Sequence, residues 1–199
     1  VGLVDQDQSN GNVERTRSWL RKIGDFRETW SVMNGANFID WKAERKDPVH
    51  LGSVEVVPLF PAEDNALWCP EENDATLSRI IGTDLTEERK ALFDLLFMPG
   101  KEEQDLPLGK GYRGRAHVGA TALVAAMLEH GSEIMGRMRE LMEDPSRRKV
   151  NVFVVGSAFG GTGAAGFPTL ARALNRMRRS SDFINGNNVT MGGMLMLPY

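Results

Sequence analysis

The sequence predicts an α/β fold with a mainly parallel, Rossmann-like sheet and helices on both faces. An apolar run rich in β-branched residues, Val150–Val155, has the composition of a buried strand. A glycine-rich turn follows it, and apolar residues then recur at helical spacing from Phe167 to Met177. Residues 189–198 have the composition of the next strand. Strand, glycine turn, helix and strand in this order are typical of a parallel sheet, whose ligands lie beyond the carboxyl ends of the strands.

The first hundred residues predict shorter elements. Residues 1–6 are expected to form a strand and residues 7–12 a polar loop. A helix then runs to about Phe26. Its expected apolar side consists of Val13, Trp19, Leu20 and Ile23. The region after it contains three tryptophans, several prolines and one strand candidate, residues 54–60.

The middle of the chain predicts three more helices. Two short ones are expected to end at Ile81 and Phe97, with caps at residues 73–74 and 84–87. A charged loop follows over residues 98–110. The third helix is expected to run from His117 to about Glu143, where Asp144 and Pro145 end it, with Gly131 bending it.

Composition narrows the class of protein. The chain is 41% hydrophobic and 26% charged, which is typical of a globular protein. A net charge of −3 argues against a dedicated nucleic-acid binder. A single cysteine cannot form an intramolecular disulfide, and it cannot build a zinc site with three scattered histidines. No apolar run reaches the roughly 18 residues of a membrane span, and the start does not resemble a signal peptide. We therefore expect a soluble, cytoplasmic protein without a membrane span.

The glycine-rich turn is predicted to bind phosphate. It consists of Gly160, Gly161, Thr162, Gly163 and Ala164, and it joins the central strand to a helix. Glycines let the backbone approach a ligand closely, and a helix N-terminus directs N–H groups and positive potential at an anion. The Thr162 hydroxyl is expected to donate a hydrogen bond to a phosphate oxygen. The turn is not a P-loop, because no Gly-Lys-Ser/Thr follows the glycines.

The Gly-Gly-Thr-Gly of residues 160–163 resembles the signature loop of the tubulin/FtsZ family. Phe159 and Ala165 depart from the family pattern, which suggests a divergent bacterial tubulin-like protein. Three further segments follow the order of the family. They are an N-terminal strand that leads to Asp7, a glycine-rich loop over residues 111–119, and a strand that ends in Pro198-Tyr199. The resemblance covers roughly half of the chain.

This resemblance implies a GTP-binding domain, with GTP hydrolysis coupled to self-assembly into a homo-oligomer or filament in the full-length protein. GTP or GDP would bind through the backbone of residues 160–164, and Asp7 would hold Mg²⁺. The loop residues near the γ-phosphate would be Gly111, Arg113, Gly114 and Arg115. The two arginines, which the family does not have there, would neutralise phosphate charge directly.

The resemblance also implies that residues 1–199 are a single, incomplete nucleotide-binding domain. Residues 30–100 would be an insertion or a strongly remodelled region. The guanine-contacting helices and the catalytic acidic loop would follow Tyr199, so no catalytic residue is assigned.

Two alternatives stay open. One is a nucleotide-gated scaffold or binding module that does not hydrolyse GTP. The other is an NAD(P)-binding domain like that of short-chain dehydrogenases, because residues 156–163 also echo their glycine loop. Against it, no acidic residue ends the following strand and no Tyr-x-x-x-Lys is present.

Overall fold

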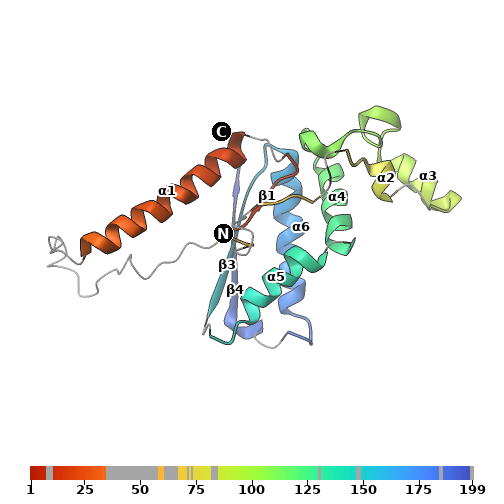
Figure 1. The fold of residues 1–199 in the computed structure, drawn as a ribbon. Helices are drawn as coiled ribbons and strands as arrows, with labels where there is room; N and C mark the ends of the chain where they lie inside the picture. The colour runs from red at the N-terminus through yellow and green to blue at the C-terminus, as the bar shows by residue number, and fades with distance from the viewer. Residues whose placement is uncertain are drawn as a thin grey trace. The chain divides into compact units, whose positions relative to one another are not determined.

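The computed structural model describes residues 1–7, 11–34, 58–60, 67–70, 72, 74–81, 85–129, 131–146, 149–183 and 186–197 (Figure 1). The chain divides into two compact units. Unit 1 comprises residues 1–3 and 9–67, and unit 2 comprises residues 4–8 and 68–199. Every residue predicted to contact a nucleotide or Mg²⁺ belongs to unit 2.

The described residues of unit 1 belong mainly to helix α1, Gly11–Asn34, which continues beyond the predicted end at Phe26. Its predicted apolar side is only partly right. Val13 is buried, but Trp19 is 59% exposed and Ile23 is also exposed. Most of the predicted strand at 54–60 lies outside the described residues.

Two short strands lie where the units meet in sequence. β1, Leu3–Val4, pairs with β2, Leu67–Trp68. The predicted strand over residues 1–6 is therefore present but shorter. Within unit 2 the backbone N–H of Asp5 donates to the carbonyl oxygen of Trp68 over 3.3 Å.

The centre of unit 2 is a strand–helix–strand arrangement, as predicted. Strand β3, Val150–Ser157, runs parallel to β4, Val189–Met196, with pairing from Val150↔Val189 to Ser157↔Met196. Helix α6, Gly161–Arg178, connects them and packs on both. The fold is mixed α/β with parallel strands, and this part of the prediction is confirmed.

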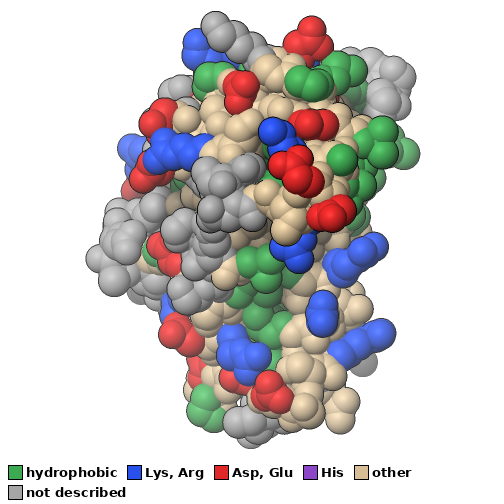
Figure 2. Space-filling view, turned by 90° about the vertical axis from the view of Figure 1, so that its right-hand side faces the viewer, with side chains coloured by type: hydrophobic (Ala, Val, Ile, Leu, Met, Phe, Trp, Pro, Cys, Tyr) green, Lys and Arg blue, Asp and Glu red, His purple; other side chains and the backbone are tan. Residues whose placement is uncertain are grey.

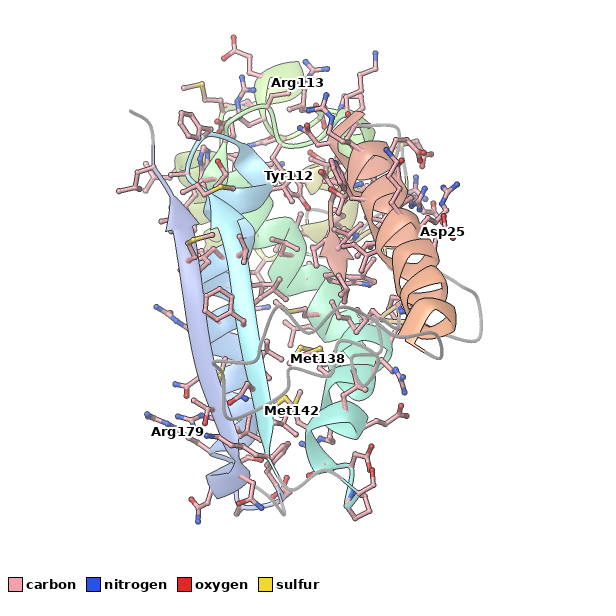
Figure 3. All side chains as sticks on the ribbon, turned by 90° about the vertical axis from the view of Figure 1, so that its left-hand side faces the viewer. Asp25, Tyr112, Arg113, Met138, Met142 and Arg179 are labelled. Carbon is pink, nitrogen blue, oxygen red and sulfur yellow. The ribbon has the colours of Figure 1, made fainter. Side chains whose placement is uncertain are left out.

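One face of the β3–β4 sheet faces the core of unit 2. Alternate residues of the strands pack there against a cluster formed by Met142, Leu174, Phe183 and Val189. Figure 3 shows Met138 and Met142 of helix α5 in this core. The other face is also apolar, and on it Phe153 is 64% exposed and Val155 and Met194 are exposed too. Apolar residues on both faces explain why β3 appears in the sequence as a nearly continuous hydrophobic run.

The predicted long helix is in fact two helices. α4 spans Ala116–Glu129 and α5 spans Gly131–Glu143. The second helix begins at Gly131, the residue at which the sequence predicted a bend. Glycine is a poor residue for a helix interior, since its backbone loses the most conformational freedom on folding. α4 packs beside α6 on the same side of the sheet (Figure 1).

The two short helices that precede α4 are confirmed. α2 spans Leu77–Ile81 and packs on α4, and α3 spans Glu87–Leu96. The 3₁₀ turns η3, Gly100–Glu102, and η4, Leu108–Lys110, lie in the predicted loop between α3 and α4.

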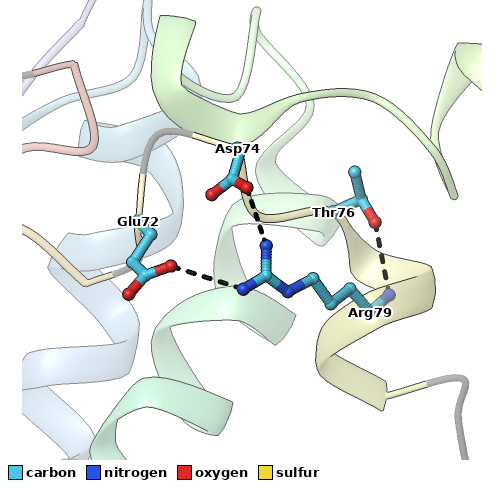
Figure 4. A network of polar contacts seen from close by, with 4 residues as sticks. All are labelled: Glu72, Asp74, Thr76 and Arg79. Carbon is cyan, nitrogen blue, oxygen red and sulfur yellow. Dashed lines mark hydrogen bonds and ion pairs between the residues drawn. The ribbon is translucent and has the colours of Figure 1, made fainter.

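The cap of α2 lies later than the predicted residues 73–74, whereas that of α3 lies within the predicted residues 84–87. At α2, the Thr76 hydroxyl accepts the Arg79 N–H at 3.2 Å. The guanidinium of Arg79 meanwhile binds Asp74 at 2.9 Å and Glu72 at 3.4 Å (Figure 4). At α3 the N-cap is Thr86. Threonine at a cap satisfies a backbone N–H that the helix itself leaves free.

Within the described ranges, no helix combines the length and the apolar composition that crossing a membrane requires.

Candidate functional site

Three segments that are far apart in the sequence meet in unit 2. They are residues 5–7, the glycine loop 111–115, and the turn at the start of α6. The Thr162 hydroxyl donates to Asp5 Oδ1 over 3.3 Å. A Cβ built on Gly161 would lie 3.3 Å from the Gly114 nitrogen, and one on Gly111 would lie 3.8 Å from Asp7 Cβ. Each of the three segments has its own signal in the sequence, and the fold brings them together.

The α6 N-terminus directs backbone donors at this meeting point. The helix begins at Gly161, after an extended Gly160 that supplies no side-chain cap. The Ala164 N–H bonds to the Gly160 carbonyl oxygen at 3.0 Å, so it is used by the helix and is not free for a phosphate. The N–H groups of residues 161–163 lie in the first turn of the helix, where no carbonyl oxygen of the same helix can accept them. They are the donors that an anion would meet.

The glycines of the turn have different structural roles. A Cβ on Gly163 would overlap the Ser157 carbonyl oxygen and lie 2.7 Å from the Ser157 nitrogen. A Cβ on Gly161 would lie 2.6 Å from Tyr112 Cβ. Both glycines are therefore needed for packing, whatever the ligand. Gly160 is exposed and has no atom within 4 Å of such a Cβ, so its missing side chain leaves the turn open to solvent.

Thr162 and Asp5 form the polar centre of the site. A hydroxyl has a single hydrogen to donate, and that of Thr162 points to Asp5. Donation to a phosphate, as the sequence predicted, would require the hydroxyl to turn away. Burial raises the pKa of the Asp5 carboxyl above its ordinary value, and the nearby Asp7 acts in the same direction. Hydrogen bonds from the Asp7 N–H and from Thr162 oppose this shift without cancelling it.

The loop 111–115 has an unusual backbone. Gly111 has φ 75°, Arg113 has φ 48° and Gly114 has φ 77°. The left-handed region suits glycine, but a residue with a Cβ adopts it at a cost. Figure 3 labels both residues, and Arg113 lies nearer the top of the view than Tyr112. Tyr112 is 1% exposed, whereas Arg113 is exposed and makes no ion pair with any described residue.

Arg115, by contrast, is engaged in an ion pair. Its Nε lies 3.4 Å from Oε1 of Glu103, and His117 Nε2 lies 2.9 Å from the same oxygen. Glu103 is buried. Both arginines were predicted to lie near the γ-phosphate, but their surroundings differ. Arg113 faces solvent, whereas Arg115 forms an ion pair with a buried carboxylate.

Two residues that were not predicted, Tyr112 and Gln6, join the three segments. Tyr112 packs against Gly119 of α4 and Gly161 of α6, and its hydroxyl donates to Gln6 Oε1 at 3.5 Å. Gln6 is fully buried, and its carbonyl oxygen accepts the Cys69 thiol at 3.5 Å. Tyr112 is the only aromatic residue between Gly109 and Gly119, and this was the one signal available in the sequence.

The oxygen atoms near the site fit magnesium better than a transition metal. Asp5 and Asp7 are two residues apart, and magnesium is commonly held by one or two carboxylates together with phosphates and waters. No group of three or more His, Cys, Asp or Glu side chains in the described part of the chain forms a metal cage.

No protein-family model matches the chain, and neither a curated protein nor a solved structure matches it.

Proposed function

We propose that this chain is the GTP-binding domain of a tubulin/FtsZ-like protein, in which GTP hydrolysis is coupled to self-assembly of the full-length protein. The proposal includes the Rossmann-like sheet of that family, with helices on both faces, and a cytoplasmic location. The observation that supports it best is the meeting of residues 5–7, 111–115 and 160–163 at the carboxyl end of β3.

Each part of the site has a role in this proposal. The N–H groups of residues 161–163 bind the α- and β-phosphates, with the positive end of α6 behind them. Arg113 lies on the exposed side of its loop and binds the γ-phosphate. Asp7 holds Mg²⁺, and Asp5 keeps Thr162 in place. Bound Mg²⁺ would neutralise charge on the phosphates, which is much of what phosphoryl transfer requires of a protein.

The dinucleotide alternative is weaker. In such proteins an acidic residue after the second strand binds the ribose. Here β4 ends in Leu195 and Met196, and Leu197 follows, so no carboxylate is available at that position.

The non-hydrolysing alternative keeps the same site but removes turnover. The contacts of Asp5 with Thr162, and of Glu103 with Arg115 and His117, support it to the extent that both carboxylates already have partners. Binding and hydrolysis must therefore be measured separately.

The first test is binding of labelled GTP to the 199-residue chain with and without Mg²⁺, with GDP, ATP and NAD as competitors. We expect GTP to bind in a Mg²⁺-dependent way, and Asp7→Asn to reduce that dependence. Asp182→Asn is the matched control, since Asp182 is exposed and follows the other end of α6. Tighter binding of NAD than of GTP would contradict the proposal. GTP binding that does not depend on Mg²⁺ and is equal in both variants would also contradict it.

A further inference from the structure

Glu103 is a buried charge that the proposed nucleotide contacts do not use. It follows the 3₁₀ turn η3 and is 5% exposed. A buried carboxylate is costly unless charged and hydrogen-bonding partners satisfy it. Its partners therefore indicate what the residue does.

The two oxygens of Glu103 have different partners. Oε2 accepts the backbone N–H of Met98 at 2.9 Å, directly after α3. Oε1 takes both Arg115 Nε and His117 Nε2. Desolvation alone would raise the pKa of Glu103, but these three partners outweigh it and hold the pKa below its ordinary value. The carboxylate thus links the end of α3 to the start of α4.

The link lies where the glycine loop ends. The Gly111 N–H donates to the Leu108 carbonyl oxygen, and the Arg115 N–H donates to that of Tyr112, both over 2.8 Å. Tyr112 packs against α6 on the inner side of the loop. Glu103 holds Arg115 at the other end of the loop. Between these two anchors Arg113 stands at a positive φ with its side chain exposed.

We propose that Glu103 is a positioning residue which fixes the loop 111–115 so that Arg113 faces the terminal phosphate of the bound nucleotide. This rests on the proposed function. Arg115 acts through Glu103 and does not contact phosphate. The preference for GTP over GDP then depends on Glu103, although Glu103 does not touch the nucleotide.

His117 belongs to the same arrangement and is not a general base. Its ring stacks on Phe97, with centroids 5.8 Å apart and an interplanar angle of 15°. Gly119, two residues further along α4, faces Ala165 of α6. Residues two apart on a helix lie on nearly opposite sides. His117 therefore points away from the α6 N-terminus.

The test compares Glu103→Gln with Glu102→Gln in the 199-residue chain. Glu102 is the exposed neighbour, and it forms no ion pair with a described residue. We expect Glu103→Gln to weaken GTP at least about tenfold more than GDP, since a charge-assisted contact is lost only with GTP. Glu102→Gln should behave as wild type. Adding Arg113→Ala to Glu103→Gln should cause little further loss, because residues acting as a unit are not additive.

A second readout needs no nucleotide. Hydrogen exchange of the Arg115 and Gly119 amides should speed up in Glu103→Gln, while that of the amides in the middle of α6 should not. If Glu103→Gln does not fold, His117→Gln replaces it and should lower the preference for GTP in the same direction.

The outcomes separate the two proposals. A wild-type chain that binds neither nucleotide overturns the proposed function, and this inference falls with it. A wild-type preference for GTP that survives unchanged in Glu103→Gln, or in His117→Gln, overturns this inference alone.

Discussion

At the scale of single residues, the backbone of Arg113 is the most informative feature of the site. A left-handed conformation costs a residue with a Cβ roughly 1–2 kcal/mol. Strain of this kind persists where the surroundings impose it, and it is concentrated at binding and catalytic sites. Gly111 and Gly114 adopt the same region without strain, so within this loop the backbone strain falls on Arg113 alone. This points to a use for the guanidinium.

Comparing Arg113→Ala with Arg113→Gly separates the charge from the backbone. Both should weaken GTP by about 1.5–3 kcal/mol, the range for a lost hydrogen bond to a charged group. Arg113→Gly should also stabilise the fold by up to about 1 kcal/mol, since relief of strain exceeds the entropy cost of glycine. GTP titration and urea unfolding measure the two effects. Full GTP affinity in Arg113→Ala would show that Arg113 is a surface residue without a role in GTP binding.

The residue types of the site could be recognised in the sequence, but the side chains that each residue contacts could not. Gly161 and Thr162 were identifiable because glycines and a hydroxyl after a strand have a known chemistry. Glu103 was not identifiable, since an acidic residue in a charged loop is ordinarily exposed. Its burial depends on Arg115 and His117, which only the fold brings to it. For the same reason the Thr162 hydroxyl was assigned to a phosphate, whereas it donates to Asp5, 157 residues away in sequence.

At the scale of elements, the close packing of α4 against α6 helps to hold the glycine loop of the site in place. A Cβ on Gly119 would lie 2.6 Å from the Tyr112 ring and 2.9 Å from Ala165 Cβ. Both distances are shorter than carbon atoms tolerate, so the helices approach this closely only because residue 119 is glycine. Tyr112 in turn holds the glycine loop.

Gly119→Ala should therefore reduce both stability and GTP affinity, although residue 119 does not contact the nucleotide. Overpacking of this kind typically costs about 1–3 kcal/mol. Gly136→Ala is the matched control, because it lies in α5 with no atom within 4 Å of its Cβ. It should stabilise the protein by about 0.5–1 kcal/mol and leave binding unchanged. Thermal unfolding and GTP titration of both variants make the comparison. Equal behaviour of the two would argue that Gly119 has no special role.

Elements with a strong repeat were predictable, and their ends were less so. β3, α6 and β4 were expected because a β-branched run, a glycine turn and a helical repeat each have one local explanation. The division into α4 and α5 was expected only as a bend at Gly131, since the apolar residues continue at helical spacing across it. The cap of α2 was placed at residues 73–74, slightly before Thr76, because several polar residues compete for such positions.

At the scale of the whole molecule, the site joins residues 5–7 to two segments that lie more than a hundred residues later in the sequence. The carboxyl ends of parallel strands meet at one edge of a sheet, which is why residues beyond β3 could be expected to bind a ligand. That rule does not say that residues 5–7 and 111–115 arrive there as well. The expectation came only from a family resemblance, and the packing of Tyr112 and Gln6 gives it a physical basis.

The last prediction concerns turnover. A water molecule that attacks the γ-phosphate must be oriented by a side chain, and positioning of this kind contributes much of the rate. In the described part of the site Asp5 and Glu103 already hold protein partners. If a neighbouring subunit supplies the missing acidic group, the 199-residue chain should bind GTP and release phosphate negligibly. In the full-length protein, phosphate release per molecule should rise with concentration, together with light scattering.

Arg113→Ala, measured in parallel, controls for contaminating hydrolases. A rate per molecule that is constant across the dilution series, with no scattering at any concentration, would instead indicate a self-contained hydrolase whose attacking water is oriented within one subunit.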